Sequence, residues 1–199
     1  MSDPLLVATD VSRSYDVRGH DVLALRPTSL TVRAADVLVV TGPSGTGKST
    51  LVSILAGWDR PTSGTVERPA RTVFVPQRLA LLDTLTVQDN IALADAARAT
   101  DVPALAAALA VDHLLDRFPT EISLGERQRV GLARALHAAA PVTILDEPTA
   151  HQDGDHTRLV LDALTSLPGD RAVVVATHDS IVVAVATAVV HLEAAVAAS

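Results

Sequence analysis

The stretch Gly42-Pro43-Ser44-Gly45-Thr46-Gly47-Lys48-Ser49 concentrates three glycines and the only lysine of the chain within eight residues. It lies between the apolar run Val37–Val40 and the apolar-periodic stretch Leu51–Ala56, which predict a buried strand before it and a helix after it. In the spacing G-x-x-x-x-G-K-[ST], small residues let successive backbone N–H groups surround phosphate oxygens without interference from Cβ atoms. The sequence therefore predicts a phosphate-binding loop between a strand and a helix.

Lys48 is the only lysine among 16 basic residues, and the other 15 are arginines. A chain that otherwise uses guanidinium groups keeps the compact ammonium where a phosphate is bound as a point charge. We expect Lys48 to reach the β- and γ-phosphates and Ser49 to offer its hydroxyl to Mg²⁺. The backbone of Gly42–Thr50 and the positive end of the following helix complete the predicted ATP or GTP site.

Length and composition narrow the class of protein. A chain of 199 residues predicts one domain, 1–199. A net charge of −7 with 2% aromatic residues argues against a nucleic-acid partner, and the absence of cysteine excludes disulfides and thiol chemistry. Met1–Pro4 lacks the basic and apolar regions of a secretion signal. The longest apolar stretch, Ile181–Val190, is shorter than the roughly 20 residues that span a bilayer. We expect a cytosolic location, with any membrane connection made through a partner.

The first half of the chain predicts strands and an inserted helical part. Leu5–Thr9 and Leu30–Val32 are expected as short strands, separated by a polar segment, Ser12–His20, that is consistent with a loop. A further buried strand, Thr72–Val75, leads to the polar side chain of Gln77. Helical spacing of apolar residues then predicts helices over Thr86–Arg98 and Ala104–Arg117, with Pro103 suited to a first helical turn. These helices belong to a predicted insertion at about 85–135.

The segment from Thr120 to Ala139 predicts a helix that begins at Ser123. Ser123 is followed three residues later by Glu126, which is the spacing of a capping box. The free N–H groups at the tip of such a helix form an anion site, although a well-capped helix with no ligand has the same pattern.

Two further strand ends carry chemistry. Asp146 and Glu147 end the buried strand that begins at Pro141, where carboxylates are poorly solvated unless a cation relieves them. Beside a phosphate loop, Asp146 is expected to hold Mg²⁺ through its water shell and Glu147 to orient or deprotonate the attacking water. A solvated turn between strand and helix is the alternative. His178 ends the strand Ala172–Ala176 at the same predicted sheet edge, where either a structural role or contact with a γ-phosphate is possible, and the placement favours the contact.

Strands that alternate with helices, including a helix at Gly154–Leu167, predict an α/β fold with a doubly wound parallel sheet. The combined pattern resembles the nucleotide-binding subunit of ABC transporters over nearly the whole chain. The resemblance rests on six features in order, namely Gly42–Ser49, the Gln77 loop, Ile122-Ser123-Leu124-Gly125-Glu126, Asp146-Glu147-Pro148-Thr149, Asp153 and His178.

The resemblance implies a P-loop NTPase fold with a mostly parallel sheet, a small antiparallel β part and an inserted helical subdomain. It also implies that Tyr15 stacks on adenine, that Gln77 contacts Mg²⁺ and the attacking water, and that Glu147 is the general base. The segment Ser123, Gly125 and Glu126 belongs to a signature that closes on the ATP of a second copy in a head-to-tail homodimer, with Asp153 linking the two sites.

The partners implied by the resemblance are a second nucleotide-binding subunit and an integral membrane permease, whose helices dock beside Gln77 and the inserted helices. The implied location is the cytoplasmic face of the cell membrane, reached through the permease. Within the family, the pattern leans toward small subunits of the lipoprotein-releasing, macrolide-export or metal-uptake type.

Departures from the family pattern leave alternatives open. The usual signature is Leu-Ser-Gly-Gly-Gln, so Leu124 stands where a glycine is common. Leu124 weakens closure if the backbone there needs a positive φ, and it costs little if the position is an ordinary helix N-terminus. Ala150-His151-Gln152 replaces the usual Ser-Ala-Leu before Asp153, with small effects expected.

Three functions follow as hypotheses. The first is an ATP-hydrolysing subunit that powers a separate permease. The second is a nucleotide-dependent interaction or regulatory module with weak ATPase activity, which restoring glycine at Leu124 would distinguish. The third, a soluble family member in translation or DNA repair, is disfavoured because such proteins carry two domains or a long coiled coil.

Overall fold

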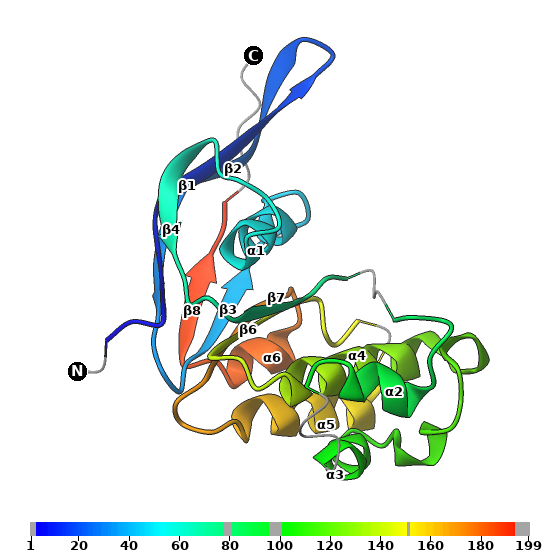
Figure 1. Cartoon of the computed structure of the whole chain (residues 1–199). Coiled ribbons are helices and arrows are strands. Elements are labelled where there is room, and N and C mark those ends of the chain that lie inside the picture. Colours follow the sequence, from blue (N-terminus) through cyan, green and yellow to red (C-terminus); the bar gives the residue numbers. More distant parts are fainter. Residues whose placement is uncertain (1–2, 78–80, 96–100, 151, 194–199) are drawn as a thin grey trace.

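A five-stranded parallel sheet forms the centre of the molecule (Figure 1). The computed structural model describes residues 3–77, 81–95, 101–150 and 152–193. The strand order is β5-β6-β7-β3-β8, and the strands are β3 (Val37–Thr41), β5 (Thr72–Val75), β6 (Val142–Asp146), β7 (Ala172–Ala176) and β8 (Ala188–His191). The predicted parallel α/β sheet is thus confirmed, and its three central strands are runs of Val, Ile and Leu because both of their faces are covered.

Each face of the parallel sheet has its own apolar core. Side chains of one parity, such as Val39 and Val175, pack with the helices that follow residue 86, while their neighbours, such as Val40 and Val174, pack with α1 (Lys48–Ala56) and the antiparallel sheet. This alternation is the two-residue period of a β-strand. Both faces of the sheet are therefore packed, which fixes the position of the edge where the carboxyl ends of its strands lie.

The antiparallel sheet has the order β2-β1-β4, with β1 (Leu6–Val17), β2 (His20–Val32) and β4 (Ser63–Glu67). The prediction of two short strands with a loop over Ser12–His20 is wrong, because β1 and β2 form one long hairpin that projects from the body of the molecule (Figure 1). Arg18 and Gly19 both have positive φ, which is the geometry of a two-residue hairpin turn. The projecting part is exposed on both faces, so it lacks the alternation that identifies a half-buried strand.

The helical part contains α2 (Val87–Ala92), α3 (Val102–Ala108) and α4 (Leu124–His137), followed after β6 by α5 (Gly154–Thr165). Thr86 caps α2, which ends at Ala92, so the predicted continuation of this helix is wrong over residues 93–95; its predicted end, Arg98, lies outside the described residues. Pro103 lies in the first turn of α3, as predicted, but α3 ends at Ala108 instead of Arg117, because Ala110 turns the chain with a φ of 51°. The division into one domain, 1–199, with a helical insertion at about 85–135 remains a prediction.

The apolar stretch Ile181–Val190 divides between two elements. Its first part belongs to α6 (Ser180–Ala184) and its last part to β8. In the described part of the chain, no helix has the length and apolar character that crossing a bilayer requires.

Candidate nucleotide-binding site

The predicted phosphate loop connects β3 to α1. Gly42, Gly45 and Gly47 all have positive φ, and a Cβ atom at Gly42 or Gly47 would collide with the carbonyl oxygens of Leu192 or Ala24. These two glycines are therefore required both by their backbone conformation and by close packing against β2 and the segment after β8. Gly47 is the N-cap of α1 and supplies no side-chain cap, so the first amides of the helix are available to an anion.

Lys48 is buried within the loop. Its Nζ donates hydrogen bonds to the carbonyl oxygens of Gly42 at 2.8 Å and Pro43 at 3.2 Å. The Thr46 hydroxyl donates to the same Pro43 carbonyl at 2.9 Å, which closes the loop on itself. Gly42 and Pro43 thus hold the ammonium group, and Thr46 maintains the loop. The remaining predicted loop residues line an open cleft.

This cleft has a volume of about 600 Å³ and lies where the carboxyl ends of the strands meet the hairpin. It brings together residues that are far apart in the sequence, as predicted for Gln77, Glu147 and His178. The lining residues are Val22, Leu23, Ala24, Ser44, Gly45, Gly47, Lys48, Ser49, Thr50, Gln77, Glu147, Ala150 and His178. A cleft with one ammonium group and a helix N-terminus is suited to a phosphorylated ligand.

Asp146 ends β6 with a buried carboxylate whose Oδ1 has no hydrogen-bond partner among the residues that the structure describes. Burial raises the pKa of Asp146, and the neighbouring Glu147 adds to this, while a hydrogen bond from Ser49 and the charge of Lys48 oppose it. A buried carboxylate with a free oxygen beside a hydroxyl is a donor set that fits Mg²⁺, which prefers oxygen ligands and uses phosphates and waters for the remainder. Ser49 and Asp146 are therefore suited to the predicted metal role.

Glu147 and His178 form a contacting pair at the edge of the cleft. His178 Nδ1 lies 2.8 Å from Glu147 Oε1, and the Thr177 hydroxyl donates to Glu147 Oε2 at 2.9 Å. Glu147 itself has a φ of 51°, a conformation that costs a non-glycine residue roughly 1–2 kcal/mol. A carboxylate fixed at both oxygens on a strained backbone is suited to the predicted role of a base, and its imidazole partner is largely exposed.

Thr177 belongs to this arrangement, although it is not among the residues predicted from the sequence. Its side chain is completely buried, and its hydroxyl also accepts a hydrogen bond from the Asp179 amide at 3.1 Å. The signal that could have found it is its position, directly before His178 at the end of a buried strand, where an apolar residue would otherwise be expected.

Tyr15 does not line the cleft, although it pairs across the hairpin with Val22, which does. Its hydroxyl donates to Asp59 Oδ2 at 2.7 Å, and the guanidinium of Arg13 lies 4.5 Å from the centre of its ring. One face of the ring is therefore already covered by a cation. Stacking of Tyr15 on adenine stays a prediction.

The predicted capping box at the start of α4 is confirmed. The Ser123 hydroxyl accepts a hydrogen bond from the Glu126 amide at 3.3 Å, and Glu126 Oε2 lies 2.7 Å from both the amide and the hydroxyl of Ser123. These bonds lower the pKa of Glu126. Neither residue, nor Gly125, lines the cleft of its own chain.

Comparisons with known proteins agree with this geometry. The family described as ABC transporter matches residues 25–150, more than half of the chain. The chain belongs to the ABC transporter family. The mycobactin import ATP-binding/permease protein IrtB of Mycolicibacterium thermoresistibile is 36% identical over 200 residues, covering 88% of this chain and 34% of its own length. The macrolide export ATP-binding/permease protein MacB of Burkholderia thailandensis is 31% identical over 217 residues, covering 96% of this chain and 33% of its own length.

Solved structures of ABC cassettes have the same fold as this chain. The dimeric structure of MJ0796, a bacterial ABC transporter cassette, has a TM-score of 0.85 at 25% identity, with 94% of both chains covered. A dimer of the same cassette in a post-hydrolysis state bound to ADP and Pi gives a TM-score of 0.84. As a member of this family with the fold of its cassettes, the chain binds and hydrolyses ATP. It spans about a third of the length of the curated ABC relatives that it matches.

The structure gives the backbone conformation of Leu124, in the segment that resembles the ABC signature. Leu124 is the first helical residue of α4, directly after the N-cap Ser123, so its backbone is right-handed. The glycine-only conformation that would weaken closure is not adopted here, and the side chain of Leu124 projects into solvent. Of the two alternatives, the structure has the ordinary helix N-terminus.

Proposed function

We propose that this chain is the ATP-hydrolysing subunit of an ABC transporter, which forms a head-to-tail homodimer and energises transport through a separate membrane permease. The observation that supports it most strongly is the pair of Glu147 and His178, fixed at the cleft that Lys48 and the phosphate loop line. In this proposal Glu147 takes a proton from an attacking water, and His178 contacts the γ-phosphate. Lys48 exchanges its loop carbonyls for phosphate oxygens.

Three residues would hold Mg²⁺ together with the nucleotide, namely Ser49, Asp146 and Gln77, which follows β5. When bound, this ion neutralises charge on the β- and γ-phosphates. Glu147 orients the attacking water and accepts its proton, and Thr177 and His178 hold the carboxylate of Glu147 in position. Tyr15 would support the adenine from the hairpin.

The proposed dimer is supported by the position of the signature residues, which do not line the cleft of their own chain. Ser123, Gly125 and Glu126 lie outside their own cleft, at the capped N-terminus of α4. In a head-to-tail arrangement they close over the ATP held by the second copy, while Asp153 lies between the two sites. The dimeric cassettes among the structural relatives support this arrangement.

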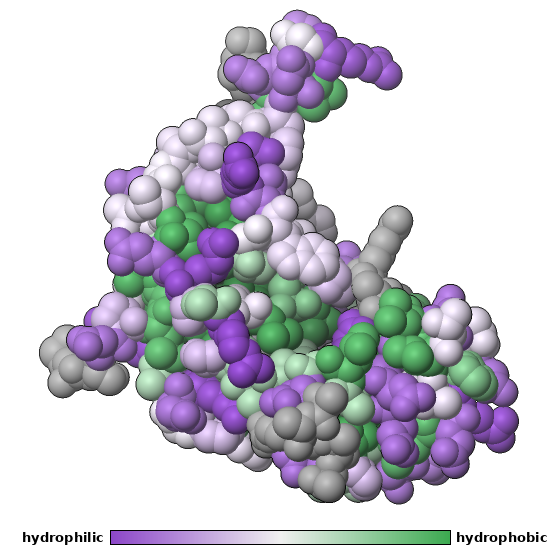
Figure 2. Space-filling view, viewed as in Figure 1, coloured by the Kyte–Doolittle hydropathy of each residue, from purple (hydrophilic) through white to green (hydrophobic). Residues whose placement is uncertain are grey.

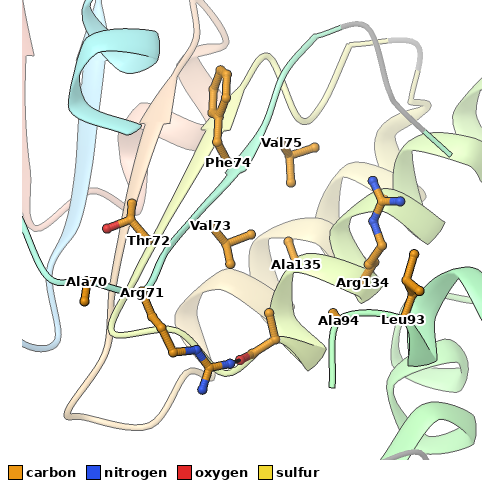
Figure 3. A pocket seen from close by; sticks show the side chains of 12 residues that line it. Ala70, Arg71, Thr72, Val73, Phe74, Val75, Leu93, Ala94, Arg134 and Ala135 are labelled. Carbon is orange, nitrogen blue, oxygen red and sulfur yellow. Dashed lines mark hydrogen bonds between the residues drawn. The ribbon is translucent and has the colours of Figure 1, made fainter. Parts of the chain in front are cut away.

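A groove for the permease lies between the edge strand β5 and the helices α2 and α4 (Figure 3). Its volume is about 470 Å³, and Val73, Val75, Leu93 and Ala135 give it apolar walls between Arg71 and Arg134. The side chain of Leu93 is 57% exposed at its rim. Figure 2 shows that apolar side chains gather over the helical part, beside a hollow in the surface. An amphipathic helix of a permease, with apolar residues and an acidic group, is complementary to this groove.

This docking would place the chain at the cytoplasmic face of the cell membrane, held there by its partner. The two relatives named above are a mycobactin importer and a macrolide exporter by name. Since both share this domain, we assign the selection of cargo to the permease.

The test is to purify the tagged chain from membranes of its host in mild detergent, as the Glu147→Gln variant with ATP, and to identify co-purifying chains by mass spectrometry. A multi-span permease in stoichiometric amount is expected. Recovery of the chain in the soluble fraction alone would contradict the energy-coupling role.

A further inference from the structure

The side chain of Gln152 joins two parts of the site that are separate in the sequence. Its Nε2 donates to the carbonyl oxygen of Gly125 and to Oε1 of Gln128, both at 3.0 Å, and its Oε1 accepts from Nη1 of Arg129 at 2.8 Å. Both ends of the amide are thus bound to the first two turns of α4. An apolar side chain of the same length can make none of these bonds.

The burial of Arg129 makes loss of its hydrogen bond to Gln152 unfavourable. Its side chain is buried, with 5% of the residue exposed, and its Nε donates to the carbonyl oxygen of Leu109 at 2.9 Å. Burial lowers the pKa of the Arg129 guanidinium. A buried guanidinium needs acceptors for its donors, and Gln152 supplies one of them.

Gln152 also occupies a specific place in the chain. It precedes Asp153, whose carboxylate caps α5 by accepting a hydrogen bond from the His156 amide at 3.0 Å, and it follows Glu147 by five residues. The loop between β6 and α5 is therefore fixed at one end by the contacts of Glu147 with Thr177 and His178, and at the other end by α4.

We propose that Gln152 is a positioning residue that couples the signature end of α4 to the loop carrying Glu147. This inference rests on the proposed head-to-tail dimer. In that dimer α4 contacts the ATP of the second copy, whereas Glu147 acts on the ATP of its own chain. Gln152 then transmits closure at one ATP site to the base at the other, so that the two sites hydrolyse ATP cooperatively.

The test measures ATP hydrolysis by the purified protein as a function of ATP concentration, for wild type, Gln152→Met and Gln152→Glu. Gln152→Met keeps the length of the side chain, and Gln152→Glu keeps the acceptor for Arg129 but loses the donor to Gly125. The matched control is Gln88→Met, because Gln88 is an exposed glutamine on α2. Binding of a fluorescent ATP analogue is measured in parallel.

For two coupled sites the wild-type Hill coefficient is expected to rise toward about two. Gln152→Met and Gln152→Glu should lower it to near one and lower kcat about tenfold, with affinity for the analogue within about twofold. Gln88→Met should behave as wild type. A merely structural role of Gln152 would lower the melting temperature and leave the Hill coefficient unchanged.

A Hill coefficient near one in wild type, or an unchanged coefficient in both Gln152 variants, would overturn the inference while leaving hydrolysis itself intact. Absence of hydrolysis in wild type would instead contradict the proposed function and the inference with it. If Gln152→Met does not fold, the double variant Arg129→Met/Gln152→Met removes the buried charge that the single change leaves unpaired. Its Hill coefficient is expected near one, and cooperativity there would refute the link.

Discussion

Replacing Thr177 by valine tests whether the orientation of Glu147 controls hydrolysis. The substitution exchanges a hydroxyl for a methyl at a completely buried side chain, so it opens no cavity. It removes the hydrogen bond to Glu147 Oε2 and the acceptor for the Asp179 amide. A hydrogen bond to a charged group contributes about 1.5–3 kcal/mol. If that contribution orients the carboxylate in the transition state, kcat falls by about 10- to 100-fold, at 1.36 kcal/mol per tenfold.

The assay is steady-state ATP hydrolysis with kcat and KM determined separately. KM is expected to change less than about threefold, because Lys48 and the phosphate loop are untouched. Thr165→Val is the control for the same chemical change, since the Thr165 hydroxyl donates within α5, to the carbonyl oxygens of Leu161 at 2.9 Å and Asp162 at 3.4 Å, away from the cleft. A Thr177→Val protein with kcat within twofold of wild type, alongside an inactive Glu147→Gln protein, would refute the reasoning.

The other predictions concern the signature helix and the groove. Leu124→Gly should change kcat by less than about twofold, because the backbone there is already helical; a large gain in steady-state ATPase activity would instead support weakened closure and the regulatory-module alternative. Glu126→Ala should lower the melting temperature at pH 7, since it removes half of the capping box, a loss on the order of 1 kcal/mol. Because the folded state lowers the pKa of Glu126, this stabilisation is present above the unfolded pKa of Glu126 and is lost as pH falls through its folded pKa. The melting temperatures of wild type and Glu126→Ala should therefore converge in acid. A difference that stays constant with pH would contradict the role of the charge. Leu93→Asp should reduce co-purification of the permease at least tenfold without changing the ATPase activity of the purified chain, and undiminished co-purification would exclude the groove as the docking site.

The parallel sheet and the phosphate loop were predictable because their signals are local. A strand buried on both faces is a continuous apolar run, as in Val37–Val40, and the glycines of the loop are dictated by backbone conformation. The acids that end β6 and the histidine that follows β7 could be placed at one edge because parallel strands share the direction of their carboxyl ends.

The long hairpin and the contacts that orient the site were not predictable in the same way. The ends of β1 and β2 next to the hairpin turn extend beyond the core, so pairing between their backbones, and not burial, maintains the strands there. The roles of Thr177 and Gln152 come from hydrogen bonds between residues 23 to 30 positions apart, which no local pattern reports. For Gln152 the sequence indicated only a small effect, because its partners on α4 become neighbours through tertiary packing.

The central claim is that Glu147 acts as the base at an ATP site completed by a second copy of the chain. The most direct measurement compares wild type and Glu147→Gln for Mg-ATP hydrolysis and for molecular mass by light scattering with ATP present. Glu147→Gln is expected to abolish turnover and to accumulate as an ATP-bound dimer, and adding Ser123→Ala to it is expected to weaken that dimer. Unchanged turnover in Glu147→Gln, or a protein that remains monomeric with ATP, would contradict the central claim.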